Sequence, residues 1–526
     1  MSGWADKRMS GWADKRMIGR GLLILVLASA HPPARLSAQV QPRGPLAARV
    51  RPLLDRLEWR RSIWGALVVS LSRGDTLLAL NADHRFVPAS NAKLFTTAAA
   101  LHYLGADYRF LTVLFADGAV TNGELFGDLV LFGTGDPTFA QDTTALAPFA
   151  DSVVLAGIRR VRGDIVGDAS FLGAELTGPG WSPDFLDQSY AAPPSALGAA
   201  ENRVRLTVTA GPRRGAPARV RAEPESDYHH ISSTVLTGQS TGITVRKGNA
   251  GVLEVSGTIA AGAAWSTWVV VDQPAVFAAG LLRQLLERRG VRITGVTRSI
   301  SDDATGRARL MLGRTARSEG AFAGAMAVRR SAPLGEIVTM INHRSHNLSA
   351  ELALRSIGRV AGGSGSFETG ARLVAQYLTN RVGIPATSVR VTDGSGLSIL
   401  DETSPRALVR LLRYQRRGAD EGPAFYRSLP VLGAVSGRRL SESPAARRVR
   451  AKTGTLNGVS ALSGYINAAG GEELAFSLMV NFAPSIPEAR AVQDSIVEML
   501  AAFSRPAPEP RRAPSRSARP APRPSP

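Results

Sequence analysis

The sequence has no cysteine among its 526 residues. This excludes disulfides, a thiol nucleophile and a lipid-modified cysteine, so stability must come from packed cores. Lysine is also scarce in this arginine-rich chain and occurs only at positions 7, 15, 93, 247 and 452. Arginine practically never releases its proton, whereas a lysine tuned by burial can act as a base. Lysines kept in such a background are therefore candidates for proton transfer.

The apolar run at residues 21–27 is far shorter than the ~20 residues that a membrane span needs. Arg20 precedes it and the small residues 28–30 follow, an order typical of a secretory signal peptide. We expect a signal peptide over residues 17–38, with cleavage after Ala30 or Ala38. The protein is then periplasmic or otherwise extracytoplasmic, and soluble or peripheral. Residues 1–16 are one octapeptide written twice and are not expected to be native.

The length and the 44% hydrophobic content predict two or more domains. The formal charge of +20 is spread as arginine without a recognisable nucleic-acid-binding module, so no nucleic-acid partner is expected. Residues 504–526 hold eight prolines and six arginines against one acid, which predicts a disordered tail. Both a solvated tail and loose contact with anionic wall polymers or a membrane surface stay open.

The first motif with chemical meaning is S-x-x-K, formed by Ser90 and Lys93. It begins an Ala- and Leu-rich run, residues 90–104, which Gly105 closes, so the pattern predicts a helix. Residues three apart share one helix face, where a neutral lysine could take the seryl proton. Alone, the motif is equally typical of a capping serine beside a surface lysine.

The second motif is S-x-N, formed by Ser345 and Asn347 between predicted helices at residues 334–342 and 348–359. A corner between two helices can direct both side chains into a cleft. Ser345 could relay a proton to a leaving amine, and Asn347 could hold a substrate amide. A capped turn would explain the same residues.

The third motif is K-T-G, formed by Lys452, Thr453 and Gly454 and followed by Thr455. It precedes two alternating segments, residues 460–467 and 473–482, which predicts three consecutive strands. Lys452 and Thr453 could bind a substrate carboxylate, and Gly454 could let the substrate backbone approach. The Thr455 N–H could join that of Ser90 in an oxyanion hole. A simple β-turn is the alternative.

The three motifs occur once each and in the order that marks penicillin-binding proteins and serine β-lactamases. About 250 residues separate the first two motifs, and this stretch contains several short alternating segments punctuated by glycine and proline. We therefore expect a large β-rich insertion at residues 117–324. The catalytic domain would then be discontinuous, at residues 39–116 and 325–503.

The chain further resembles the low-molecular-mass class C penicillin-binding proteins, a D-Ala-D-Ala carboxypeptidase/endopeptidase family, over residues 60–500. Residues 127–129 and 133–138 resemble its GGGDPT turn, residues 393–398 match its DGSGLS loop, and residues 163–165 and 181–197 are also similar. The implied fold is an α/β (α+β) transpeptidase domain, with an antiparallel sheet flanked by helices. Two positions depart from the family pattern, namely His346 where aspartate is common and residues 435–438 in place of a DGTL-like turn.

The resemblance implies that Ser90 is acylated, that Lys93 is its base and that Ser345 completes the catalytic group. Asn347, Lys452, Thr453, Gly454 and Thr455 would bind a peptidoglycan stem peptide that ends in D-Ala-D-Ala. β-Lactams would be inhibitors. A β-lactamase, or a non-catalytic protein that binds the cell wall, stays an alternative. No metal or cofactor is expected, because no H-E-x-x-H or nucleotide-binding motif occurs. The adjacent His229 and His230 are expected to be solvated.

Overall fold

The computed structural model describes residues 44–142, 144–248, 251–302, 305–306, 325–418, 420–434 and 439–506. The predicted signal peptide, the duplicated octapeptide, most of the tail and the turn at 435–438 lie outside these residues. Among the helices that the structure describes, none combines the length and the apolar character that crossing a membrane requires.

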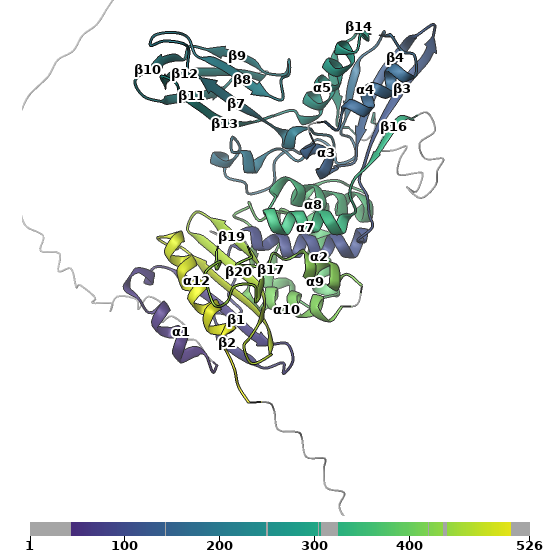
Figure 1. The fold of residues 1–526 in the computed structure, drawn as a ribbon. Helices are drawn as coiled ribbons and strands as arrows, with labels where there is room; N and C mark the ends of the chain where they lie inside the picture. Colours follow the sequence, from purple (N-terminus) through teal and green to yellow (C-terminus); the bar gives the residue numbers. More distant parts are fainter. Residues whose placement is uncertain are drawn as a thin grey trace, which may run out of the picture. The chain divides into compact units, whose positions relative to one another are not determined.

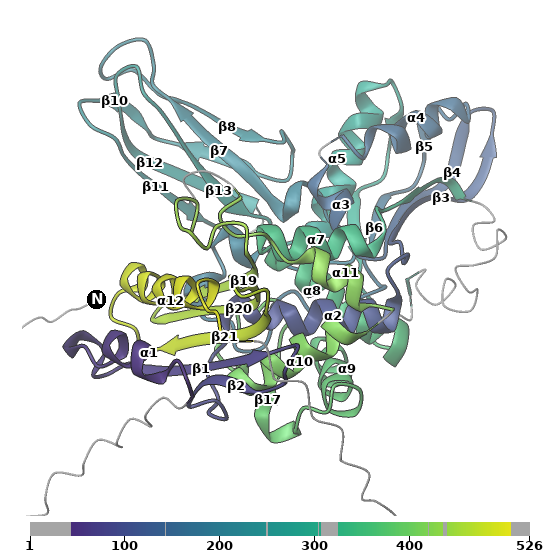
Figure 2. The same cartoon turned by 60° about the horizontal axis from the view of Figure 1, so that its bottom comes forward.

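A five-stranded antiparallel sheet in the order β19-β20-β21-β1-β2 joins the two ends of the described chain (Figures 1 and 2). Its strands are β1 (Ile63–Ser70), β2 (Thr76–Leu80), β19 (Val449–Leu456), β20 (Val459–Asn467) and β21 (Glu473–Asn481). The last three match the strands predicted around the K-T-G motif. Strand β19 is an edge strand, and among the described residues no strand pairs with its C-terminal half on the side away from β20.

Helices cover both faces of this sheet. Alternate residues of β1 divide between the two cores: Trp64 and Val68 pack with helices α1 (Ala47–Leu54) and α12 (Ile486–Ala501). Leu67 packs on the opposite face with the remaining helices of this region. These helices are α2 (Ala92–Leu104), α7 (Leu334–Arg344), α8 (Asn347–Gly362), α9 (Phe367–Asn380), α10 (Pro405–Arg417) and α11 (Gly422–Ser428). Burial on both faces explains the continuous apolar run of β1.

The chain between α2 and α7 is rich in strands, as the sequence predicts. A seven-stranded sheet contains β3 (Leu111–Thr121), β4 (Glu124–Gly133), β5 (Arg160–Val161), β6 (Ile165–Asp168), β14 (Arg292–Ile293), β15 (Thr297–Ile300) and β16 (Ala325–Arg330). A three-stranded sheet contains β7 (Arg203–Thr209), β8 (Arg219–Glu223) and β13 (Ala264–Val270). A four-stranded sheet contains β9 (His230–Ser233), β10 (Leu236–Gly238), β11 (Gly242–Lys247) and β12 (Val252–Ala260).

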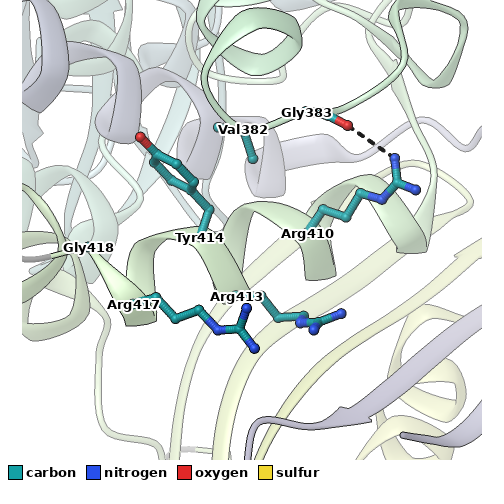
Figure 3. A pocket seen from close by; sticks show the side chains of 7 residues that line it. All are labelled: Val382, Gly383, Arg410, Arg413, Tyr414, Arg417 and Gly418. Atoms are coloured by element: carbon teal, nitrogen blue, oxygen red, sulfur yellow. Dashed lines mark hydrogen bonds between the residues drawn. The ribbon is translucent and has the colours of Figure 1, made fainter. Parts of the chain in front are cut away.

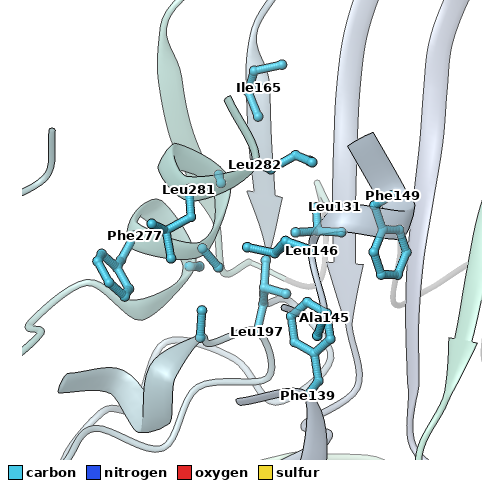
Figure 4. Packing of buried hydrophobic residues seen from close by; sticks show 14 of the residues in the cluster. Leu131, Phe139, Ala145, Leu146, Phe149, Ile165, Leu197, Phe277, Leu281 and Leu282 are labelled. Carbon is cyan, nitrogen blue, oxygen red and sulfur yellow. The ribbon is translucent and has the colours of Figure 1, made fainter. Parts of the chain in front are cut away.

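Three helices, α3 (Pro137–Gln141), α4 (Ala147–Leu155) and α5 (Pro274–Arg288), accompany the seven-stranded sheet. Their apolar side chains form one cluster with those of the sheet, and Figure 4 shows part of this packing. The cluster also includes Leu348 and Leu352 of α8, so the inserted region is packed onto the helix that follows the S-x-N motif. A short pair, β17 (Val389–Arg390) and β18 (Glu402–Thr403), completes the strands.

The insertion expected at residues 117–324 would begin within β3 and stop one residue before β16. Strand β3 starts at Leu111 and pairs with β16, which ends at Arg330, and both belong to the seven-stranded sheet. We therefore propose junctions before Leu111 and after Arg330.

The expectation that the adjacent histidines are solvated is wrong for His229. Its side chain is only 8% exposed and packs against Tyr228 and Phe277, whereas His230 is exposed. Burial lowers the pKa of His229 to about 4, so the imidazole is neutral at physiological pH. The apolar partner comes from α5, some fifty residues away in sequence, so the local pattern did not reveal it.

A buried arginine on α8 connects this helix to the chain between α2 and α7. Arg355 is fully buried and donates to four backbone carbonyls from two regions, those of Leu172, Glu175, Pro194 and Gly365. Three of these acceptors belong to the insertion. One guanidinium therefore fixes the segment after β6 against α8.

Arg355→Met is expected to lower the free energy of unfolding by about 3 kcal/mol or more, because four carbonyls, three of them in buried hydrogen bonds, lose their donor. Urea unfolding followed by circular dichroism measures this change. Arg372→Met, at an exposed site on α9, is the matched control and should change stability by less than about 0.5 kcal/mol. Equal stability of the two variants would contradict this role of Arg355.

Candidate active site

Ser90 lies in a tight turn at the start of α2. Residues Ala89–Asn91 form a 3-10 turn and the α-helix begins at Ala92, two residues later than the run in the sequence suggests. Ala89 has a φ of 48°, a left-handed conformation that is uncommon for alanine. The half-buried Ser90 still lies one turn before Lys93, and the distance between Lys93 Nζ and Ser90 Oγ is 3.0 Å.

Lys93 is completely buried and its Nζ has three oxygen partners. Besides Ser90 Oγ, it donates to Asn347 Oδ1 at 2.7 Å and to the carbonyl of Ser395 at 2.6 Å. Burial lowers the pKa of Lys93 to about 8, against the opposing effect of nearby carboxylates. A neutral Lys93 that keeps its donations to Asn347 and Ser395 would point its lone pair at Ser90.

The S-x-N motif forms the corner between α7 and α8. Ser345 ends α7 with a left-handed φ of 54°, and His346 caps α8 by accepting the N–H of Ser349. His346, at the position where aspartate is common, thus caps the helix as an aspartate could. Asn347 donates through Nδ2 to the carbonyl of Tyr190 at 2.8 Å, which brings the insertion to the site.

Lys452 on strand β19 faces the same corner. Its Nζ donates to Ser345 Oγ at 2.8 Å and to the carbonyl of Thr453 at 2.8 Å. Burial and the neighbouring charge of Lys93 hold the pKa of Lys452 well below its usual range. The three motifs therefore meet in one constellation, with Lys93 joined to Ser90 and Asn347, and Lys452 joined to Ser345.

Gly454 permits a close approach between β19 and the turn that carries Ser90. A Cβ on Gly454 would lie 2.7 Å from the carbonyl oxygen of Pro88 and 3.1 Å from the amide nitrogen of Asn91. The turn that carries Ser90 thus lies closer to Gly454 than a side chain at this position would allow. The expected approach of the substrate backbone to Gly454 stays a prediction. Asn91 Nδ2 also donates to the carbonyl of Lys452 at 3.2 Å.

Gly454→Ala is therefore expected to displace the Ser90 turn from β19 and to slow acylation by a β-lactam about 10-fold to 100-fold, because small misplacements of reacting groups are costly. Stopped-flow measurement of the acylation rate constant tests this. Gly280→Ala, in helix α5 with no atom near the added Cβ, is the control and should react like the parent protein.

Thr455 is exposed near the C-terminal end of β19, and its Oγ1 accepts a hydrogen bond from Arg490. On the same strand, the N–H of Ala451 points away from β20 and donates to the carbonyl of Pro430. Backbone groups alternate along a strand, so the N–H of Thr455 points to the same free edge. This direction is the one that an oxyanion hole shared with Ser90 requires.

Sequence reasoning did not assign the carbonyls of Tyr190 and Ser395, although both lie in segments that resemble the family. Every residue has a backbone carbonyl, so the residue types do not indicate which carbonyls contribute to a site.

The turn at residues 133–138 does not contribute to the site. Its Asp136 caps α3, and the N–H of Gly135 donates to the carbonyl of Ala196, so the turn supports the insertion.

No group of three or more His, Asp or Glu side chains suited to a metal ion occurs in the part of the chain that the structure describes. A pocket of about 410 Å³ lies beside α10 (Figure 3) and shares no residue with the constellation around Ser90. Arg410 donates there to the carbonyl of Gly383 at 3.2 Å. The pocket is therefore separate from the candidate active site.

The model of the D-Ala-D-Ala carboxypeptidase 3 (S13) family matches residues 46–503. The chain belongs to this family. A D-alanyl-D-alanine carboxypeptidase from an Actinomadura species is 33% identical over 462 residues, which cover 84% of this chain and 82% of the relative. D-alanyl-D-alanine carboxypeptidase DacB from Haemophilus influenzae is 24% identical over 429 residues, 79% of this chain and 85% of the relative.

Among solved structures, penicillin-binding protein 4 from Haemophilus influenzae superimposes with a TM-score of 0.74 at 22% sequence identity. The match covers 86% of this chain and 99% of that chain. It supports the predicted penicillin-binding/β-lactamase-like fold.

Proposed function

We propose that this protein is a serine D-Ala-D-Ala carboxypeptidase that cleaves peptidoglycan stem peptides through an acyl-enzyme on Ser90. The observation that carries the proposal is the environment of Lys93. A fully buried lysine with a pKa of about 8 contacts the Ser90 hydroxyl, and two further acceptors fix its direction. This is the arrangement of an activated nucleophile with its oriented base. Family membership supports the same activity.

In the first step, Lys93 takes the proton of Ser90 as Oγ attacks the carbonyl of the penultimate D-Ala. The N–H groups of Ser90 and Thr455 stabilise the oxyanion. The peptide C–N bond breaks, an ester forms on Ser90, and the leaving D-Ala amine receives a proton through Ser345. Water then attacks the ester, which releases the shortened peptide and returns the proton to Ser90.

Substrate binding is assigned to the remaining motif residues. Asn347 would hold a peptide amide, and Lys452 and Thr453 would bind the terminal carboxylate beside Gly454. A bound carboxylate raises the proton affinity of a buried lysine, so substrate would keep Lys452 charged. The same machinery would cut D-alanyl cross-links, which makes endopeptidase action a second reaction of this site.

The proposed setting is extracytoplasmic, after removal of residues 17–38. Peptidoglycan stem peptides would be the substrate and β-lactams the inhibitors. The basic tail would add loose contact with an anionic wall or membrane surface, although Arg505 at its start is bound by Asp75 and Glu472.

This proposal can be tested with purified protein that comprises residues 39–526. The protein is incubated with a fluorescent penicillin and, separately, with an acyl-D-Ala-D-Ala peptide. A long-lived adduct together with release of D-Ala supports the carboxypeptidase. A transient adduct with hydrolysed penicillin and no release of D-Ala would instead indicate a β-lactamase. Neither reaction in a folded protein would indicate a non-catalytic wall-binding protein. A cross-linked peptide dimer measures endopeptidase action.

A further inference from the structure

The loop at residues 392–401 supplies the carbonyl of Ser395 to Lys93, and this loop is held by buried carboxylates. Asp393 Oδ1 accepts the N–H groups of Ser395 and Gly396, and its Oδ2 accepts that of Ser398. Trp181 from the insertion also donates to Asp393 Oδ2, at 2.9 Å. The position of the Ser395 carbonyl therefore depends on groups that never touch Ser90.

Glu351 on α8 holds the same loop from the other side. Its side chain is completely buried, with Oε2 accepting the N–H of Gly394 at 2.6 Å and Oε1 accepting that of Ser395 at 2.9 Å. Because both oxygens accept N–H groups, this arrangement suits the ionised carboxylate. Thr96 of α2 donates to the carbonyl of Gly394 at 2.7 Å, so the peptide between residues 394 and 395 cannot rotate freely.

Glu351 has no part in the proposed two-step reaction. Its carboxylate nevertheless accepts the N–H of Ser395, the residue whose carbonyl accepts a hydrogen bond from Lys93. Burial of a charged side chain is unfavourable unless the charge is hydrogen-bonded or paired with an opposite charge. We propose that Glu351 is a positioning residue for Lys93, fixing the Ser395 carbonyl while its negative charge acts on the ammonium group. The inference rests on the proposed function and deepens it.

Several charged groups share this environment. Asp393 and Asp401 from the loop and Glu351 from α8 raise the proton affinity of Lys93, whereas burial lowers it. Lys452 on β19 is close enough for Lys93 to affect its pKa, and Arg355 lies one turn along α8 from Glu351. Burial raises the pKa of Glu351 to about 8, whereas its hydrogen bonds with Ser395 and Gly394 and the charge of Lys93 favour the ionised form.

Glu351→Gln is expected to have two effects. The amide cannot accept both N–H groups, so the Ser395 carbonyl shifts and acylation by a β-lactam slows by about 10-fold to 100-fold. Loss of the negative charge also makes Lys93 release its proton more easily, so the acid limb of the acylation profile moves to lower pH by about one unit or more. A purely structural role would lower the rate at every pH without moving this limb.

The titration of Lys93 can be measured directly, because residues 39–526 contain only three lysines. Carbon-13 labelling at lysine Cε gives three NMR signals, and Lys93→Arg identifies the one from Lys93. A lower midpoint for Lys93 in Glu351→Gln than in the parent supports the inference. An unchanged midpoint overturns it, even when the parent protein acylates normally. No acylation of the parent would count against the proposed function instead.

Two further variants complete the design. Glu351→Asp keeps the charge but shortens the reach, so slower acylation with the parent's pH midpoint is expected. If Glu351→Asp has both the acylation rate and the pH midpoint of the parent, the inference is wrong. This test remains decisive even if Glu351→Gln fails to fold. Glu472→Gln neutralises a carboxylate that is 8% exposed and paired with Arg505, and should leave the Lys93 midpoint unchanged.

Discussion

Ser90→Ala is expected to abolish the covalent adduct with fluorescent penicillin and to lower kcat for D-Ala release by about 10⁴-fold or more, since it removes the proposed nucleophile. The half-buried Ser90 Oγ is the hydroxyl that Lys93 Nζ contacts, at 3.0 Å. Gel fluorescence after denaturation detects the adduct, and mass spectrometry of a proteolytic digest locates it.

Ser152→Ala is the matched control, because Ser152 is a helical serine in α4, outside the three motifs, whose hydroxyl donates to the carbonyl of Phe149. It should label like the parent protein. A stable adduct that persists in folded Ser90→Ala would show that another residue is acylated, and the assignment of the nucleophile would be wrong.

Lys93→Arg is expected to reduce the rate constant of acylation by about 10³-fold, within the range of general base catalysis. Arginine keeps the positive charge but does not release its proton. In the parent, the pKa of Lys93 is lowered to about 8, so the neutral base becomes more abundant as pH rises towards this value. Acylation should therefore increase with pH and level off above about 8, and this rise should disappear in the variant.

Lys247→Arg provides the charge-matched control. Lys247 pairs with Asp187 and Asp272 in the insertion, and arginine can keep these ion pairs. Its pH profile should match that of the parent. Lys93→Met removes the base without adding bulk at this fully buried position, and the same loss of rate is expected. A pH-independent acylation rate in the parent would refute Lys93 as the titrating base.

The residues proposed to react could be selected from the sequence because each motif is local. Ser90 and Lys93 are one helical turn apart, so their sequence spacing alone places them together. The alternating segments after Lys452 predicted its strand, and the two predicted helices beside Ser345 predicted the corner that carries it. The order of these motifs then indicated the fold, which the solved relative supports.

The supporting groups were not predictable in the same way. Glu351 reads as an ordinary helical residue four positions after Asn347, and only packing against residues 394–395 shows what it holds. Gly454 proved to serve the approach of the Ser90 turn. His229 is buried by Phe277 from α5. Each depends on contacts between residues far apart in sequence, which local periodicity does not encode.

The sequence by itself thus determined which side chains are proposed to react and which elements carry them, because the motifs of the proposed nucleophile, base and strand are defined over a few residues each. Only the tertiary structure decided how the base is oriented, how the insertion reaches the site through Tyr190 and Trp181, and where the inserted sheet begins. The physical reason is that orientation and proton affinity arise from burial and from carbonyls and charges that folding brings together.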